Sequence, residues 1–199
     1  MSGTAQYVPI DEKHPLQGQS PYSASKIGAD RLAESFWRSF DLPVVTVRPF
    51  NTYGPRQSAR AVIPTIITQA LTQDEVRLGN LLPTRDFTFV TDTVAGLVAA
   101  AEAAGVVGQE MNLGTGHEIA IGDLAEMIIA MIGQPVRIVT EDVRLRPSAS
   151  EVERLLSDDS RAKQLIGWSP QITLDEGLQL TIAWIREHLD LYRLGVYEI

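Results

Sequence analysis

The chain has 199 residues, of which 44% are hydrophobic, so it is long enough for one domain or a domain and a half with a sizeable core. Its net charge of −8, without a basic tract, argues against a nucleic-acid-binding surface. The absence of cysteine excludes disulfides and thiol catalysis. The most apolar run, 94–107, contains Glu102 and is too short to span a bilayer, and no basic, apolar leader is visible. We therefore expect a cytoplasmic protein that does not bind membranes.

The first expected element is a helix from Ser20 to Phe40, which ends before Pro43. Tyr22 and Lys26 are four residues apart in it, so their side chains share one face, one turn apart. An ammonium beside a phenol favours the phenolate and makes tyrosine a usable base below its free pKa of about 10. Taken alone, this spacing is more typical of a solvated helix face than of an active site.

The same helix carries a set of apolar residues at helical spacing, which predicts a face packed in the core. They are Ala29, Leu32, Ala33, Phe36 and Phe40.

The remaining elements follow in an alternating α/β order. Strands are expected at 44–49, 76–78, 85–90, 110–114 and 136–140, and helices at 61–71, 93–104, 121–132, 160–166 and 174–189. Thr91 or Asp92 is expected to cap the helix at 93–104, and Gly133 to end the helix at 121–132. The charged segment 142–159 is expected to be a loop.

Several motifs, spread over nearly the whole chain, resemble one family. They are Ser20-Pro-Tyr-Ser-Ala-Ser-Lys26, the run VVTVRPFNTYGPR from Val44 to Arg56, RDFTFV at 85–90, NLGTG at 112–116 and LIGW at 165–168. Together they are similar to the extended short-chain dehydrogenase/reductase family, and within it to the NAD-dependent epimerases and dehydratases of nucleotide sugars.

This resemblance implies an α/β fold: the C-terminal part of a Rossmann-type NAD(P)-binding fold plus a small α/β substrate-binding lobe. Residues 1–60 would be the remnant of the Rossmann domain and 61–199 mainly the nucleotide-sugar-binding lobe, with about 85–115 returning to the Rossmann sheet. The N-terminal βαβ units, with the Gly-rich phosphate turn and the strand of the catalytic Ser or Thr, are absent from the sequence. Gly114-Thr-Gly116 lacks the spacing to replace that turn.

The resemblance also implies a catalytic and cofactor-binding set. Tyr22 would be the catalytic base or acid, and Lys26 its electrostatic partner and a ligand of the nicotinamide ribose. The backbone at Pro49 would border the nicotinamide of NAD. No metal is expected, because the three histidines, at 14, 117 and 188, lack the spacing of metal ligands.

A second implied set binds the nucleotide sugar. Asn51 would hydrogen-bond the phosphates, although a turn-forming asparagine is the alternative. A diphosphate favours planar, permanently charged, bidentate donors, which makes Arg85 and Arg146 the candidates. Arg85 matches its family position well, whereas Arg146 matches loosely and Arg144 could replace it.

The function expected of the whole enzyme is an NAD-dependent 4,6-dehydratase of a UDP- or GDP-linked hexose or N-acetylhexosamine, acting as a homodimer. The resemblance implies that the helix at 20–40 helps to form a helical dimer interface, which would leave Phe36 and Trp37 partly exposed. A nucleotide-sugar 4-epimerase is the alternative reaction, because the extra acidic groups that separate the two would lie beside the absent Ser or Thr. A third alternative is a non-catalytic fragment that binds sugar nucleotide or self-associates.

Overall fold

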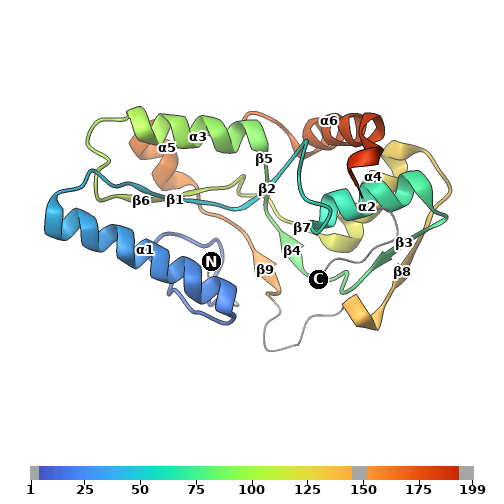
Figure 1. Ribbon diagram of the computed structural model, residues 1–199, viewed down its shortest axis with the longest axis horizontal. Helices are drawn as coiled ribbons and strands as arrows, with labels where there is room; N and C mark the ends of the chain where they lie inside the picture. Colours follow the sequence, from blue (N-terminus) through green and yellow to red (C-terminus); the bar gives the residue numbers. More distant parts are fainter. Residues whose placement is uncertain (1–4, 145–151, 193–199) are drawn as a thin grey trace.

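The computed structural model describes residues 5–144 and 152–192, in which helices alternate with short strands (Figure 1). The helices are α1 (Pro21–Phe40), α2 (Val62–Thr72), α3 (Val90–Glu102), α4 (Ile121–Ile132), α5 (Ser160–Ile166) and α6 (Leu174–Glu187), with 3-10 turns η1 (Asp142–Arg144) and η3 (Leu189–Leu191). The strands are β1 (Thr46–Pro49), β2 (Asn51–Tyr53), β3 (Glu75–Leu78), β4 (Thr84–Arg85), β5 (Phe87–Phe89), β6 (Glu110–Leu113), β7 (Ile119–Ala120), β8 (Arg137–Thr140) and β9 (Arg154–Leu155).

The strands pair mostly in parallel, and their partners are far apart in the sequence. β1 pairs with β6, β2 with β5, and β3 with β8, all in parallel. β4 lies between β9, to which it is parallel, and β7, to which it is antiparallel. Parallel pairs need long crossover connections, and helices supply them here, which gives the expected α/β class.

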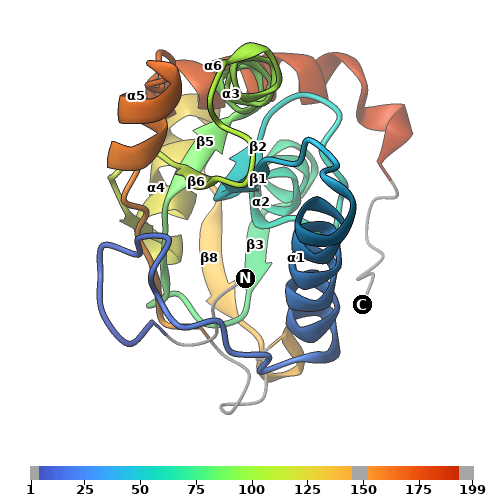
Figure 2. The ribbon, with the colours of Figure 1, turned by 90° about the vertical axis from the view of Figure 1, so that its left-hand side faces the viewer.

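Two buried clusters lie toward opposite ends of the molecule (Figure 1). Around β1 and β6, the smaller cluster includes Met111, Leu113 and Trp168 and is covered by α3 and α5. The larger cluster packs α2, α4 and α6 together with β3, and Ile66 and Leu178 are fully buried within it. Figure 1 places α1 on one side of the β1–β6 pair and α3 with α5 on the other, and Figure 2 shows the same arrangement end-on.

Helix α1 begins as its sequence predicts, but it does not form core. Ser20 caps the helix in a capping box with Ser23, and Asp41 ends it in the left-handed region at φ 54°. No residue of α1 is buried, and the side chains of Leu32 and Phe40 are 61% and 73% exposed, so the expected core face is wrong. Helical spacing marks an apolar face, but such a face becomes core only when another element covers it. Among residues 5–144 and 152–192, no element covers the apolar face of α1 enough to bury any of its residues.

Some elements differ from the sequence-based expectation because tertiary contacts define them. The sequence does not predict the two-residue strands β7 and β9, and β9 lies within the segment expected to be a loop. β2 forms between Pro49 and Gly54, where turn residues suggest a turn. Helix α3 begins at Val90 without a side-chain cap. Asp92 does not cap it, because its carboxylate accepts the backbone N–H groups of Gln171 and Ile172, each at 3.0 Å.

Candidate functional site

The pair Tyr22 and Lys26 lies on the exposed N-terminal half of α1. The Lys26 ammonium is 5.5 Å from the centroid of the Tyr22 ring, and the tyrosine is 71% exposed. Pro21 at the first helical position and the Ser20 cap begin the helix one residue before Tyr22. The helix therefore holds a phenol and an ammonium side by side, where a ligand can reach both.

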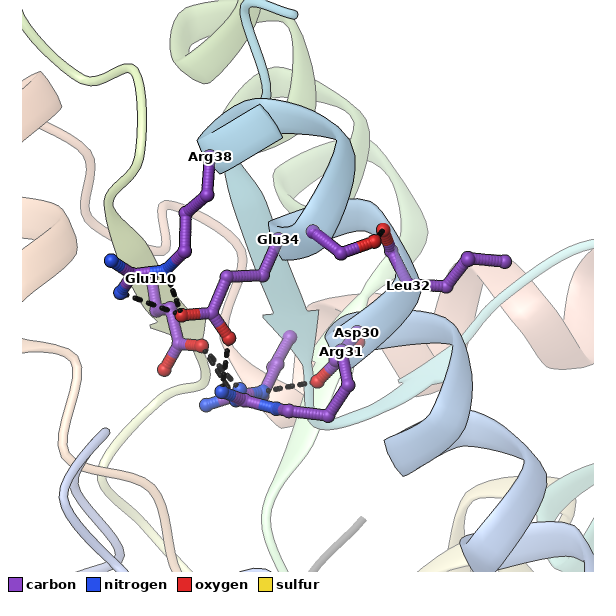
Figure 3. A network of polar contacts seen from close by, with 8 residues as sticks. Asp30, Arg31, Leu32, Glu34, Arg38 and Glu110 are labelled. Atoms are coloured by element: carbon purple, nitrogen blue, oxygen red, sulfur yellow. Dashed lines mark hydrogen bonds and ion pairs between the residues drawn. The ribbon is translucent and has the colours of Figure 1, made fainter. Parts of the chain in front are cut away.

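A cluster of charged side chains connects α1 to the sheet (Figure 3). Asp30, one turn after Lys26, accepts a hydrogen bond of 2.9 Å from Nε of Arg48 on β1, and the side chains of Asp30 and Arg48 are only 14% and 7% exposed. Glu110 on β6 pairs with both Arg48 and Arg31, each at 3.0 Å. Because α1 buries none of its own residues, these ion pairs are a main connection between the Tyr22–Lys26 helix and the strands.

The C-terminal half of α1 is placed by a close backbone approach. Gly108, just before β6, has φ +76°, and a Cβ there would overlap the indole ring of Trp37. The indole therefore fits against this glycine, where any side chain would displace it. The sequence singles out neither this contact nor the Arg48–Asp30 pair, because both join segments that are far apart in the chain.

Pro49 and Asn51 line one cavity at the carboxyl end of β1. Its volume is about 100 Å³, and Arg48, Phe50, Asn112, Leu155 and the N-terminal loop residues Ile10, Asp11, His14 and Leu16 complete the lining. In parallel α/β sheets, ligands bind at the carboxyl ends of the strands. Asn51 is not a turn residue but the first residue of β2, and its Nδ2 donates to the backbone oxygen of Asp86 at 2.9 Å.

The expected diphosphate ligands lie elsewhere or cannot be placed. Arg85 is half-buried on β4, at the centre of the β7–β4–β9 sheet, and its Nη1 donates to the backbone oxygen of Thr84 at 2.8 Å. Arg146 lies outside the described residues. Arg144, its substitute, is 16% exposed and donates through Nε to Glu141 at 2.7 Å. Tyr22, Lys26 and Arg85 do not line the cavity that contains Pro49 and Asn51.

Metal-binding clusters and membrane-spanning helices are both absent from residues 5–144 and 152–192. In that part of the chain, no group of three or more His, Cys, Asp or Glu side chains is arranged to hold a metal ion. None of the helices described there is both long and apolar enough to cross a membrane.

Comparison with known proteins gives a consistent family. A family model described as GDP-mannose 4,6 dehydratase matches residues 1–181. UDP-glucose 4-epimerase of Mycolicibacterium smegmatis is 32% identical over 188 residues, which are 92% of this chain and 58% of that protein.

Two solved structures superpose closely. An epimerase of Methanothermobacter thermautotrophicus has a TM-score of 0.86 and 30% identity over 93% of this chain and 56% of its own. dTDP-glucose 4,6-dehydratase of Bacillus anthracis, solved in complex with NAD, has a TM-score of 0.84 and 29% identity over 96% of this chain and 60% of its own.

These matches confirm the expected α/β fold of the Rossmann type. The chain spans 56% to 60% of the length of these three proteins. Both dehydratases and epimerases are among these relatives, so the similarity does not select one reaction. The match over residues 1–181 shows that the chain belongs to the GDP-mannose 4,6 dehydratase family, within the extended short-chain dehydrogenases/reductases.

Proposed function

We propose that the chain supplies the Tyr–Lys pair and the sugar-nucleotide-binding part of an NAD-dependent nucleotide-sugar 4,6-dehydratase. The substrate would be a UDP- or GDP-linked hexose or N-acetylhexosamine. The observation that carries the proposal is the Lys26 ammonium 5.5 Å from the Tyr22 ring centroid on an exposed helix face, in a chain of this family.

In this proposal the chain's own residues handle the proton and orient the sugar. Tyr22 takes the proton from a sugar hydroxyl as the hydride leaves the same carbon, and Lys26 stabilises the negative charge that develops on the phenol oxygen. Bound NAD supplies the hydride acceptor. Asn51 and Arg85, with Arg146, hold the diphosphate, because a guanidinium offers two parallel donors to phosphate oxygens.

The residues present fit only one end of the cofactor. Tyr22 and Lys26 would meet the nicotinamide ribose, and Pro49, which lines the cavity at the end of β1, would border the nicotinamide. The pyrophosphate of a dinucleotide is held chiefly by a Gly-rich turn at a helix N-terminus. The sequence contains no G-x-x-G-x-x-G segment, so we expect the 199-residue chain to bind NAD weakly and not to turn over by itself.

Two alternative functions are each favoured by a specific observation. A nucleotide-sugar 4-epimerase is favoured by the similarity to the epimerases of Mycolicibacterium smegmatis and Methanothermobacter thermautotrophicus. A non-catalytic protein that binds sugar nucleotide or self-associates is favoured by the exposed apolar residues of α1, with Phe36 44% and Phe40 73% exposed. The same residues support a proposed homodimer that buries α1 against its copy. The division into a Rossmann part and a substrate lobe also remains a proposal.

The test uses Tyr22→Phe in the whole enzyme, with Tyr7→Phe as the matched control. Tyr7 is also exposed, at 44%, but its hydroxyl donates to Asp11 and it has no lysine partner among the contacts described. We expect Tyr22→Phe to abolish turnover while sugar-nucleotide binding survives, and Tyr7→Phe to keep both. NMR of the product separates a 4-keto-6-deoxy sugar from a C4 epimer. Near-normal turnover of Tyr22→Phe would remove its catalytic role.

A further inference from the structure

Asp86 is a fully buried carboxylate in the RDFTFV motif, beside the proposed diphosphate ligand Arg85, and the proposed function gives it no role. The exposed fraction of Asp86 is 0%. It lies between β4 and β5, where its backbone N–H donates to Leu155 at 2.8 Å and its backbone oxygen accepts from Asn51 at 2.9 Å. The main chain of Asp86 thus lies between the two residues proposed to bind the nucleotide sugar.

The Asp86 carboxylate accepts four hydrogen bonds from two distant segments. Oδ1 accepts from the backbone N–H and the hydroxyl of Thr115, at 2.8 and 2.6 Å. Oδ2 accepts from the backbone N–H groups of Gly116 and Ser157, at 3.0 and 3.1 Å. Charge-assisted bonds to a buried carboxylate are about twice as strong as neutral ones, so this group joins three parts of the chain firmly.

The Gly-Thr-Gly turn is shaped to receive this carboxylate. A Cβ at Gly114 would overlap the side chain of Ser157 and lie 2.9 Å from Oδ2 of Asp86, so only glycine fits. The amides of Thr115 and Gly116 point into a small anion-binding concavity, and the protein's own carboxylate occupies it. Burial raises the pKa of Asp86, while the hydrogen bonds from Thr115, Ser157 and Gly116 act in the opposite direction.

We propose that Asp86 is a positioning residue for nucleotide-sugar binding: by fixing the turn at 114–116 and the segment after β9 to β4, it holds Asn51 and Arg85 in their relative places. This role rests on the proposed function of those two residues. Asp86 itself does not touch the ligand, because four protein donors surround its carboxylate and leave it fully buried.

Binding to the 199-residue chain tests the role directly. Calorimetry with UDP-glucose, GDP-mannose and dTDP-glucose would compare wild type with Asp86→Asn, at a temperature where both are folded. The amide that this substitution introduces must present its NH₂ to at least one N–H donor, so we expect at least about tenfold weaker binding, equivalent to about 1.4 kcal/mol. Asp92→Asn is the matched control, because Asp92 is also buried and accepts two backbone N–H bonds, but from Gln171 and Ile172. The affinity of this variant for the nucleotide sugars should stay within about twofold of the wild-type affinity.

Two further variants keep the proposal testable if Asp86→Asn does not fold. Thr115→Val removes one donor and should weaken binding about threefold or more, whereas Thr115→Ser keeps the hydroxyl and should restore it. In an Arg85→Ala background, Asp86→Asn should reduce the nucleotide-sugar affinity by a smaller factor than it does in wild type, because the effects of substitutions at residues that act together are not additive.

The outcomes separate the two levels of the proposal. Absence of binding by wild type to all three ligands would overturn the proposed function together with the role of Asp86. Wild-type binding with unchanged affinity in folded Asp86→Asn, or in Thr115→Val, would overturn the positioning role alone. Full additivity with Arg85→Ala would also overturn it.

Discussion

Replacing Asp30 by asparagine should loosen helix α1 without unfolding the rest of the chain. The Asp30–Arg48 contact joins α1 to β1 at 2.9 Å, and both side chains are largely buried. Asparagine keeps an acceptor at this place but loses the charge. Arg48 stays charged, so the remaining bond is still charge-assisted, and losing one of the two charges should remove about half of the 1.5–3 kcal/mol that a bond to a charged group contributes, about 1–1.5 kcal/mol.

The expected effect is local because α1 has no buried residue to hold it by apolar contacts. A loss of about 1.4 kcal/mol makes the opening of α1 about tenfold more frequent. Removing the arginine instead, in Arg48→Met, leaves Asp30 and Glu110 without their shared partner. Glu110 keeps Arg31, so we place that loss at the lower end of the range for broken buried pairs, about 3 kcal/mol.

Amide hydrogen exchange measured by mass spectrometry distinguishes these effects. Peptides from 21–40 should exchange about tenfold faster in Asp30→Asn, while peptides from α4, where Leu124 and Ile128 are fully buried, should not change. Arg38→Met is the control, since the Glu34–Arg38 pair on the same helix involves an arginine that is 64% exposed and should contribute about 0.3–0.5 kcal/mol. Unchanged exchange of α1, or equal acceleration of α4, would refute the reasoning.

Three other predictions concern the sugar-nucleotide end and the surface. In the whole enzyme, Arg85→Ala should weaken binding of UDP or GDP more than binding of NAD, and equal losses in calorimetric titrations of both ligands would count against a diphosphate role. A hydrogen bond from Arg154 lowers the pKa of Glu118 below its usual 4.5. This carboxylate therefore stabilises the fold above that value, and the contribution disappears as the pH falls through the lowered pKa. In Glu118→Gln, the melting temperature should fall less as the pH is lowered through this range. An identical fall in the variant and the wild type would disprove the contribution of Glu118. Phe36→Glu should reduce self-association in light scattering if α1 forms an interface, and an unchanged mass would exclude that face.

The elements that the sequence predicts well are those with local signals. The apolar periodicity of 121–132, followed by Gly133 at φ +75°, matches α4 residue for residue. Ser20 and Pro21 predict the start of α1, and with it the side-by-side arrangement of Tyr22 and Lys26. In each case the relevant contacts lie within one or two helical turns, so spacing alone determines them.

Other features depend on partners that the sequence does not pair. The strands β7 and β9 have two residues each, too few for a visible alternation, and they exist only because both pair with β4. Arg48 and Asp86 lie within the motifs at 44–56 and 85–90, but the sequence does not show what their side chains contact, since their partners Asp30 and Thr115 are 18 and 29 residues away. The exposed face of α1 departs from the expected core because periodicity reports that a face is apolar, not what covers it.

The three-stranded sheet that contains Arg85 has a consequence for the order of folding. β7 follows β4 only after α3 and β6, and β9 only after α4 and β8, so no two of these strands are neighbours in the sequence. Strands of two residues have no stability of their own. The entropy cost of closing the loops between them arises before the strand pairing stabilises the sheet. The sheet should therefore assemble late, after helices such as α2 and α4 have formed. A nucleotide sugar that needs Arg85 would then bind only molecules that have finished folding, and its binding signal in refolding experiments should lag behind the return of helical circular dichroism.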